Sequence, residues 1–333
     1  MVVVTGASSG IGRCTAGLFA RHGWHVGLIA RGKVGLEAAC RDVEAHGAAA
    51  AMEQVDVTDP NALEAAARVF ERVLGPIDVW VNCAGNASYG RFLDIPAEEF
   101  RRVTDVTYLG TVNGTRAALK LMVPRDRGCI VNVCSAVAFH GMPLLSSYSG
   151  AKHAVRGFNQ SVRAELEQDG SRVGLTTVFP PAVNTPFFDH AVSHMGRPSR
   201  PMPPVYQPEM VAEAIHLAAT TYRREMPVSF TAVLFAWGTR LVPGLVERAI
   251  RRLGYSGQLT AQETSAERYD PTLFAPSGRE SPIRGAFSEQ ARSGSAHVYL
   301  LSRLARLGRR RRYRGEAKPA AARLPGSVHE PSA

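Results

Sequence analysis

Residues 2–12 of the chain read VVVTGASSGIG, a short apolar run followed at once by a glycine-rich turn. Consecutive apolar and β-branched residues favour a buried strand, and the glycines allow the backbone to turn tightly into a following helix. A turn of this kind, between a first strand and a first helix, brings helix N-terminal amides close to a bound pyrophosphate. The stretch therefore predicts the first strand–turn–helix unit of a dinucleotide-binding fold.

The alternation of apolar runs and amphipathic segments continues through the first two-thirds of the chain. Runs rich in Val, Ile, Leu and Ala predict strands at residues 2–5, 25–30, 50–55, 77–82, 129–134 and 173–179. Longer segments between them predict helices at residues 12–22, 34–46, 61–74, 97–122 and 147–168. Strands joined by right-handed helical crossovers give an α/β, doubly wound parallel sheet of the Rossmann type. We expect one catalytic domain over residues 1–258.

The regular pattern ends near residue 258, and residues 259–333 are predicted to be a low-order, basic C-terminal extension. Residues 256–333 hold thirteen Arg or Lys and seven Asp or Glu, so most of the net charge of +10 belongs to this region. Apolar residues at helical spacing over 298–307, followed by Arg309–Arg312, have the composition of a short basic helix that can lie on an anionic membrane surface. A solvated tail without such a role is the favoured interpretation, and membrane contact is the alternative.

The composition bears on the compartment of the protein and on metal, membrane and nucleic-acid binding. The five cysteines form no CxxC pair, which indicates reduced thiols in a cytoplasmic protein and no metal site. The chain has no basic segment before an apolar run at its start and no apolar stretch long enough to cross a bilayer, so a soluble protein is expected. It begins directly in its first predicted strand, which leaves open a natural start upstream. A run such as Arg309–Arg312 can bind nucleic acid, but charged tails are usually only solvated, so no nucleic-acid partner is expected and a nucleic-acid tether is the alternative.

Further motifs follow the glycine-rich turn in a fixed order. They are Asp56-Val57, Asn82-Cys83-Ala84-Gly85, Ser135, Tyr148 with Lys152, and Pro180 through Thr185. Together with TGASSGIG they resemble the motifs of the short-chain dehydrogenase/reductase family in its compact branch, over roughly residues 1–255. The resemblance implies an oxidoreductase that uses a nicotinamide dinucleotide to interconvert a carbonyl and a secondary alcohol. It assigns cofactor binding to Gly6, Ser8, Ser9, Gly10, Ile11, Gly12, Arg31, Asp56, Val57, Asn82, Ala84, Gly85, Tyr148, Lys152, Val183 and Thr185.

Arg31 bears on the choice of cofactor. Dinucleotide-binding folds that prefer NAD place an acid near the end of the second strand, where it accepts from the ribose 2′-hydroxyl. This chain has Ala30-Arg31 there, and a guanidinium can bind a 2′-phosphate through paired, charge-assisted hydrogen bonds. NADP(H) is therefore expected. NAD(H) is the alternative, because Ser9 stands where many family members have a second basic residue; a solvated arginine at a strand end is the plainer interpretation of Arg31.

The predicted reacting group is a tyrosine. Tyr148 and Lys152 are four residues apart, so they project from one face of a predicted helix. An ammonium close to Tyr148 would favour the phenolate and lower the pKa of the phenol toward a range useful for proton transfer. Ser135 comes thirteen residues before Tyr148, just past a predicted strand, and by resemblance its hydroxyl holds the substrate oxygen.

Two positions depart from the family pattern. Thr107 stands where the family has a catalytic asparagine, and we expect it to retain a role in a proton relay with an altered rate. Pro181 replaces a glycine, which removes one backbone donor from the loop before Val183 and Thr185.

The predicted substrate is lipophilic. Residues 184–206, where the family carries its substrate lid, hold several aromatic and apolar residues, although these could equally pack the lid onto the domain. The expected reaction is on a lipophilic ketone, aldehyde or secondary alcohol. A catalytically weak NADP(H)-binding sensor or scaffold protein is the alternative function. By resemblance, we expect a homodimer or homotetramer built on residues 100–122 and 147–168.

Overall fold

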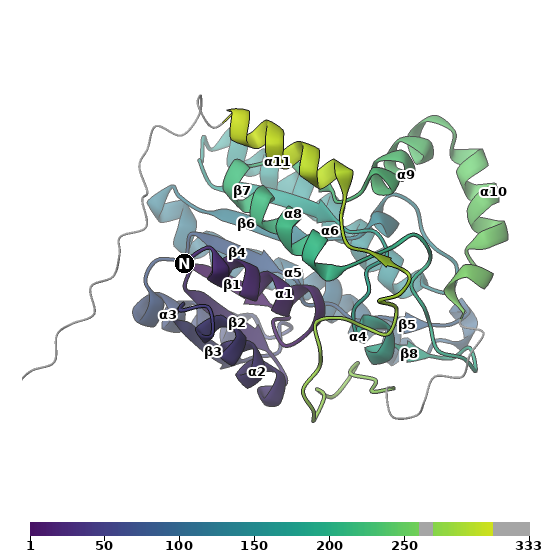
Figure 1. Cartoon of the computed structure of the whole chain (residues 1–333), viewed down its shortest axis with the longest axis horizontal. Helices are drawn as coiled ribbons and strands as arrows, with labels where there is room; N and C mark the ends of the chain where they lie inside the picture. The colour runs from purple at the N-terminus through teal and green to yellow at the C-terminus, as the bar shows by residue number, and fades with distance from the viewer. Residues whose placement is uncertain (260–268, 309–333) are drawn as a thin grey trace, which may run out of the picture.

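A seven-stranded parallel sheet forms the centre of the molecule (Figure 1). The computed structural model describes residues 1–259 and 269–308. The sheet has the order β10-β7-β6-β4-β1-β2-β3. Its strands are β1 (Val2–Thr5), β2 (Val26–Ala30), β3 (Ala50–Gln54), β4 (Val79–Asn82), β6 (Cys129–Val133), β7 (Gly174–Phe179) and β10 (Glu225–Pro227). Chain order reverses between β1 and β4, which creates the crevice at the carboxyl ends of the strands where doubly wound folds bind ligands.

Helices cover both faces of the sheet. One face carries α1 (Gly10–Arg21), α2 (Lys33–Glu44) and α8 (Pro208–Thr221), whose apolar residues pack against Val2, Val4 and Leu28 in one core cluster. The other face carries α3 (Pro60–Leu74), α5 (Gly110–Met122) and α6 (Ser146–Gln168), which enclose Trp80 and Ile130. This arrangement confirms the predicted α/β, doubly wound, Rossmann-like fold.

All six predicted strands are present. The structure adds elements that were not predicted, including a seventh strand and the helix α8, and it divides one predicted helix. The seventh strand, β10, was not predicted because three residues with Glu225 and Pro227 at its ends give no apolar run. The helix predicted over 97–122 is divided into α4 (Ala97–Thr104), a π-helical turn at Asp105–Leu109, and α5. A π turn inserts one extra residue and is often found at functional sites.

Smaller elements surround the carboxyl edge of the sheet. These are the strand pair β5 (Ser88–Tyr89) with β8 (Val192–Ser193), the pair β9 (Val205–Tyr206) with β11 (Ala291–Arg292), and the helices α7 (Phe187–His190), α9 (Phe230–Leu241) and α10 (Pro243–Leu253). In Figure 1, α9 and α10 stand beside the sheet at one end of the molecule. Among the described residues, no helix is both long and apolar enough to cross a bilayer.

Part of the predicted low-order extension follows a defined path over the domain. Residues 269–290 pass beside α1 and α2 as irregular chain, and β11 follows them before α11 (Ala296–Gly308), drawn in yellow in Figure 1. α11 confirms the helix predicted over 298–307, and its Val298 is buried in the cluster that includes α8. Irregular chain shows no periodicity, so its hydrogen bonds to the domain could not be foreseen from the sequence. The domain boundary at residue 258 stays a prediction, and Arg309–Arg312 lie outside the described residues.

Candidate active site

A cavity of about 460 Å³ runs along the carboxyl edge of the sheet, a volume within the range of small-molecule sites. The glycine-rich turn and Arg31 line one end, and Ser135, Tyr148 and Lys152 line the other. The predicted site residues that line it are Gly6, Ser8, Ser9, Gly10, Ile11, Gly12, Arg31, Asp56, Val57, Ala84, Gly85, Ser135, Tyr148, Lys152, Val183 and Thr185. The structure thus brings together nearly all of the predicted residues from six different strand ends; Asn82 and Thr107 do not line the cavity.

The glycine-rich turn is tightly folded. A Cβ at Gly12 would lie 2.1 Å from the carbonyl oxygen of Gly6, and one at Gly6 would lie 2.8 Å from the backbone of Ala84. Thr5 Oγ1 accepts hydrogen bonds from the backbone N–H groups of Cys83 and Ala84, at 3.1 and 3.3 Å, and so joins the ends of β1 and β4. A side chain at either glycine would clash with this backbone, so the tight turn at the N-terminus of α1 requires glycine, as in turns that bind a pyrophosphate.

Ser135, Tyr148 and Lys152 meet at the other end of the cavity. Tyr148 and Lys152 both come from α6, and Ser135 follows β6. Tyr148 forms a side-chain hydrogen bond with Ser135. Lys152 Nζ donates to the carbonyl oxygen of Val133 at 2.8 Å and lies 5.6 Å from the centroid of the Tyr148 ring. The phenol and the serine hydroxyl therefore lie together, with the ammonium anchored next to them.

The electrostatics at Tyr148 differ from expectation. Burial raises the pKa of Tyr148 well above its ordinary value, and the hydrogen bond with Ser135 lowers it by less. Burial also lowers the pKa of Lys152. Lys152 donates to Val133 rather than to the phenol, which explains why its proximity does not lower the pKa of Tyr148 in this arrangement. Since the pKa is raised, Tyr148 is protonated at neutral pH and is suited to donate a proton.

Thr107 holds the backbone behind the active site. It lies in the π-helical turn, fully buried, and its Oγ1 accepts from the N–H of Asn86 and donates to the C=O of Asn86, both at 3.2 Å. A Cβ at Gly85 would lie 3.7 Å from Thr107 Oγ1 and 3.9 Å from Lys152 Nζ. Thr107 therefore fixes the chain that follows β4, close to Lys152, and its one hydroxyl proton is used for that purpose.

Asn82 belongs to a buried polar network inside the sheet. Its Oδ1 accepts from the Trp80 indole N–H, and its Nδ2 donates to Asn132 Oδ1, each at 2.8 Å. Asn132 Nδ2 in turn donates to Asn159 Oδ1 of α6 at 2.7 Å. The network ties β4, β6 and α6 together, so Asn82 supports the helix that carries Tyr148 and does not itself face the cavity.

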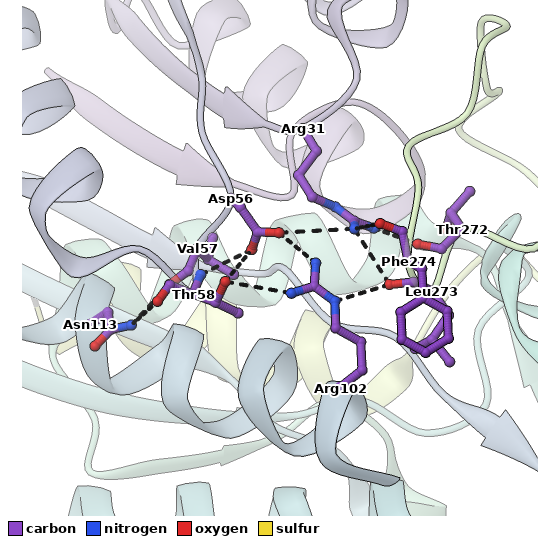
Figure 2. A network of polar contacts seen from close by, with 9 residues as sticks. All are labelled: Arg31, Asp56, Val57, Thr58, Arg102, Asn113, Thr272, Leu273 and Phe274. Atoms are coloured by element: carbon purple, nitrogen blue, oxygen red, sulfur yellow. Dashed lines mark hydrogen bonds and ion pairs between the residues drawn. The ribbon is translucent and has the colours of Figure 1, made fainter. Parts of the chain in front are cut away.

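Arg31 is bound by residues far from it in the sequence (Figure 2). Its guanidinium donates to three consecutive main-chain carbonyls of the C-terminal segment: Thr272, Leu273 at 3.4 Å and Phe274 at 3.1 Å. It also lies 4.0 Å from the carboxylate of Asp56. Arg31 thus lies at the predicted end of the cavity. Its N–H groups, which were predicted to bind a 2′-phosphate, donate to these carbonyls in this structure.

Asp56 is neutralised within the same network. Arg102, from α4, pairs with the Asp56 carboxylate and donates from Nε to Leu273 O at 3.1 Å. Burial alone would raise the pKa of Asp56, but hydrogen bonds from Arg102 and Thr58 outweigh it and hold the pKa below its usual value. Asp56 is therefore a paired carboxylate at the end of the cavity that Arg31 lines.

Apolar residues from the predicted lid and from the chain after Ser135, together with residues that the sequence did not single out, complete the walls. Part of the cavity near Tyr148 is apolar, and Tyr148 itself contacts Phe187 with ring centroids 5.5 Å apart. The apolar lining there includes Met142, Leu145, Phe187, Phe188, Met202 and Phe235. At the opposite end the lining includes Thr272, Pro276, Ser277, Arg279 and Ser281 from the C-terminal segment. These last residues lie in turn-rich sequence, and no spacing or motif sets them apart.

Comparisons with known proteins agree with this architecture. The family model described as short chain dehydrogenase matches residues 1–196. The uncharacterized oxidoreductase YxnA of Bacillus subtilis is 33% identical over 276 residues, which are 82% of this chain and 77% of that protein. The 3-dehydrosphinganine reductase of Danio rerio is 34% identical over 192 residues, 56% of this chain and 57% of that protein. The probable oxidoreductase EphD of Mycobacterium tuberculosis (strain ATCC 25618 / H37Rv) is 41% identical over 186 residues, 56% of this chain and 31% of EphD.

A solved structure shares the fold. The short chain dehydrogenase from Mycobacterium paratuberculosis bound to NAD superimposes with a TM-score of 0.60 at 24% identity, covering 68% of this chain and 94% of that chain. At this identity the likeness concerns the fold alone.

Proposed function

Because the chain belongs to the short chain dehydrogenase family, we propose that it is an NADP(H)-dependent oxidoreductase that interconverts a carbonyl and a secondary alcohol. The observation that carries the proposal is the position of Ser135, Tyr148 and Lys152 on the wall of one cavity whose other end is the glycine-rich turn. A dinucleotide bound along this cavity would have its phosphates at the N-terminus of α1 and its nicotinamide near Tyr148. The bound nicotinamide would supply or accept the hydride.

Tyr148 is the proposed proton donor and acceptor. Its raised pKa keeps the phenol protonated at neutral pH, so it can give a proton to the oxygen of a carbonyl substrate as that oxygen gains negative charge. Ser135, hydrogen-bonded to Tyr148, can donate to the same oxygen and orient it. Lys152, anchored on Val133 O, provides an ammonium for ribose hydroxyls. The arrangement favours the reduction of a carbonyl near neutral pH.

NADP(H) is the proposed cofactor, with NAD(H) as the alternative. No acid stands at the end of β2, where Arg31 is found, and the nearby Asp56 is paired with Arg102. Arg279 of the C-terminal segment lines the same cavity and supplies a second guanidinium, which Ser9 does not. Two guanidinium groups favour a 2′-phosphate over a 2′-hydroxyl.

The proposed substrate is lipophilic. The wall near Tyr148 carries Met142, Leu145 and Phe187, which would accept an apolar group rather than a charged one. A relative from Danio rerio is named 3-dehydrosphinganine reductase, and a reductase among the relatives supports the proposed reaction. Homo-oligomerisation through α4–α5 and α6, and a cytoplasmic location, remain part of the proposal.

A screen tests the reaction directly. The purified chain is incubated with NADPH or NADH and a panel of ketones and aldehydes of increasing chain length, and consumption of the reduced nicotinamide is followed by absorbance. We expect turnover with NADPH and a preference for apolar substrates. Tight NADPH binding without turnover across the panel would instead favour the second candidate, a cofactor-binding sensor or scaffold, for which the engaged hydroxyl of Thr107 is the supporting observation.

A further inference from the structure

The C-terminal segment lines the end of the cavity that lies opposite Tyr148. We call residues 270–292 the strap; five of its residues line the cavity wall, including Ser277, Arg279 and Ser281. Three of the places where the strap is bound to the domain coincide with predicted cofactor positions. In chain order these are the predicted positions of the adenosine 2′-phosphate, the pyrophosphate and the nicotinamide.

The first place is Arg31. Three consecutive strap carbonyls, those of Thr272, Leu273 and Phe274, accept from its guanidinium, and Arg102 donates to one of them. Carbonyl oxygens carry partial negative charge and accept the same N–H groups that a phosphate would accept. At this position the strap and a 2′-phosphate therefore compete for the same donors.

The second place is the N-terminus of α1. The backbone N–H of Gly10, in the predicted pyrophosphate-binding turn, donates to the strap carbonyl of Pro282 at 3.3 Å. Next to it, the buried Arg13 donates to Ser281 O at 3.0 Å and pairs with Glu280 at 2.9 Å. The strap thus binds at the same helix end as the pyrophosphate would, and one amide of that helix end is shared between them.

The third place lies beside Thr185, at the predicted nicotinamide end. Asn184 Oδ1 accepts from the N–H of Phe287 at 2.9 Å, and Asn184 Nδ2 donates to Ser288 Oγ at 3.0 Å. A Cβ at Gly285 would lie 2.5 Å from Thr185 O, so the strap approaches that backbone as closely as a glycine allows. These contacts fix this part of the strap, and none of them uses a predicted cofactor donor.

We propose that the strap is part of the cofactor-binding site. When the cofactor binds, Arg31 and the Gly10 amide release the carbonyls of residues 270–282 and donate to the cofactor's phosphates instead. Residues 270–282 must open for the cofactor to enter and leave. The proposal rests on the proposed function, since it takes the cavity to be a dinucleotide site. Residues 284–292, held by Asn184 and by β9, would stay in place as the hinge end.

The strap is also connected to the predicted substrate lid. Asp270 N and Thr272 N donate to the carbonyls of Asp189 and His190 in α7, at 3.1 and 3.0 Å. Ser281 Oγ lies 3.2 Å from His190 Nε2. Opening the 270–282 portion must break these bonds, so cofactor exchange would also loosen α7, which carries Phe187 of the substrate end.

A reversible disulfide can hold the strap closed. A Cβ at Gly32 would lie 3.5 Å from Cβ of Pro276, at the short end of the Cβ separations found in disulfides. Gly32 has φ of −89°, which any residue adopts, so Gly32→Cys is compatible with the backbone. The full chain with Gly32→Cys and Pro276→Cys is oxidised without cofactor, and the bond is confirmed by mass and free-thiol counting. Binding of NADPH and NADH is then measured by stopped-flow fluorescence, before and after reduction.

We expect the oxidised double variant to bind both cofactors more than about tenfold more slowly than its reduced form, because a closed lid must open before ligand exchange. Each single-cysteine variant is the matched control and should show no effect of oxidation. Unchanged binding rates in a protein with the confirmed disulfide would overturn the proposal, and so would failure of the two cysteines to pair. Absence of cofactor binding in the reduced variant and the unmodified chain would instead refute the proposed function.

A second variant weakens the contacts of the strap instead of fixing it, and it needs no new cysteines. Glu280→Gln removes the pairs that the strap makes with Arg13 and Arg41, and Glu280 does not line the cavity. Cofactor dissociation should become faster by a few-fold, as expected for the loss of partly exposed ion pairs. Glu289→Gln, which removes the same charge from the hinge end of the strap, is the control and should leave the rate unchanged. Equal dissociation rates in Glu280→Gln and the control would contradict a gating role for this portion.

Discussion

Replacing Arg31 by methionine should separate the two cofactors. The substitution keeps an apolar stem of similar length and removes a guanidinium that lines the cavity and donates to Thr272, Leu273 and Phe274. For NADPH, the lost charge-assisted bonds to the 2′-phosphate are worth about 1.5–3 kcal/mol, or about 10–100-fold in the dissociation constant. NADH has no 2′-phosphate, so it loses nothing at this position.

The contact between Arg31 and the strap increases the expected difference between the two affinities. In the unmodified chain both cofactors must displace the carbonyls that Arg31 holds, and in Arg31→Met neither must. NADH should therefore bind the variant as tightly as the unmodified chain or more tightly, while NADPH binds more weakly. Fluorescence titration of both cofactors gives the two dissociation constants, whose ratio is the quantity to compare.

Arg41→Met is the matched control. Arg41 also contacts the strap, through Glu280, but it does not line the cavity. Its loss should change the affinities for NADPH and NADH by the same factor. If Arg31→Met likewise leaves the NADPH-to-NADH ratio unchanged, Arg31 serves only to hold the strap and the reasoning about cofactor choice is refuted.

The rate of alcohol oxidation should rise with pH, by up to about tenfold per unit, because the pKa of Tyr148 is raised and oxidation needs the phenolate. The rate of carbonyl reduction should stay nearly constant around neutral pH. Initial rates in both directions check this, and an oxidation rate that does not change with pH would count against it. Gly12→Ala should abolish binding of both cofactors in a chain that keeps its helical circular dichroism, since the added Cβ would lie 2.1 Å from Gly6 O; normal titration curves would show that the turn is not the phosphate site. Light scattering should report a dimer or tetramer, and a stable monomer at micromolar concentration would refute pairing through α4–α5 and α6.

The sheet and most of the site could be predicted because local patterns determine them. Buried parallel strands need continuous apolar runs, and the residues that line the crevice follow directly after those strands, as Gly6, Arg31 and Ser135 do. The glycine spacing is similarly local, since Gly12 meets Gly6 only six residues away.

What could not be predicted depends on contacts between distant segments. The strap meets Arg31 through its main-chain carbonyls, which every residue possesses, so no side-chain pattern reveals the contact. The direction of the Tyr148 pKa shift depends on burial and on Lys152 donating to Val133 O, and the spacing of four residues gives neither. The role of Thr107 behind Gly85 depends in the same way on a π turn that hydrophobic spacing does not indicate.

The most direct test of the central claim is the turnover of Tyr148→Phe with a carbonyl substrate found in the screen. The phenylalanine keeps the ring contact with Phe187 and removes the hydroxyl, so cofactor binding should be retained. Loss of the proton donor should lower kcat by about 10²–10⁴-fold. Tyr299→Phe, on the exposed side of α11, removes a phenol hydroxyl away from the cavity and should leave kcat unchanged. Turnover by Tyr148→Phe at the rate of the unmodified chain would contradict the account.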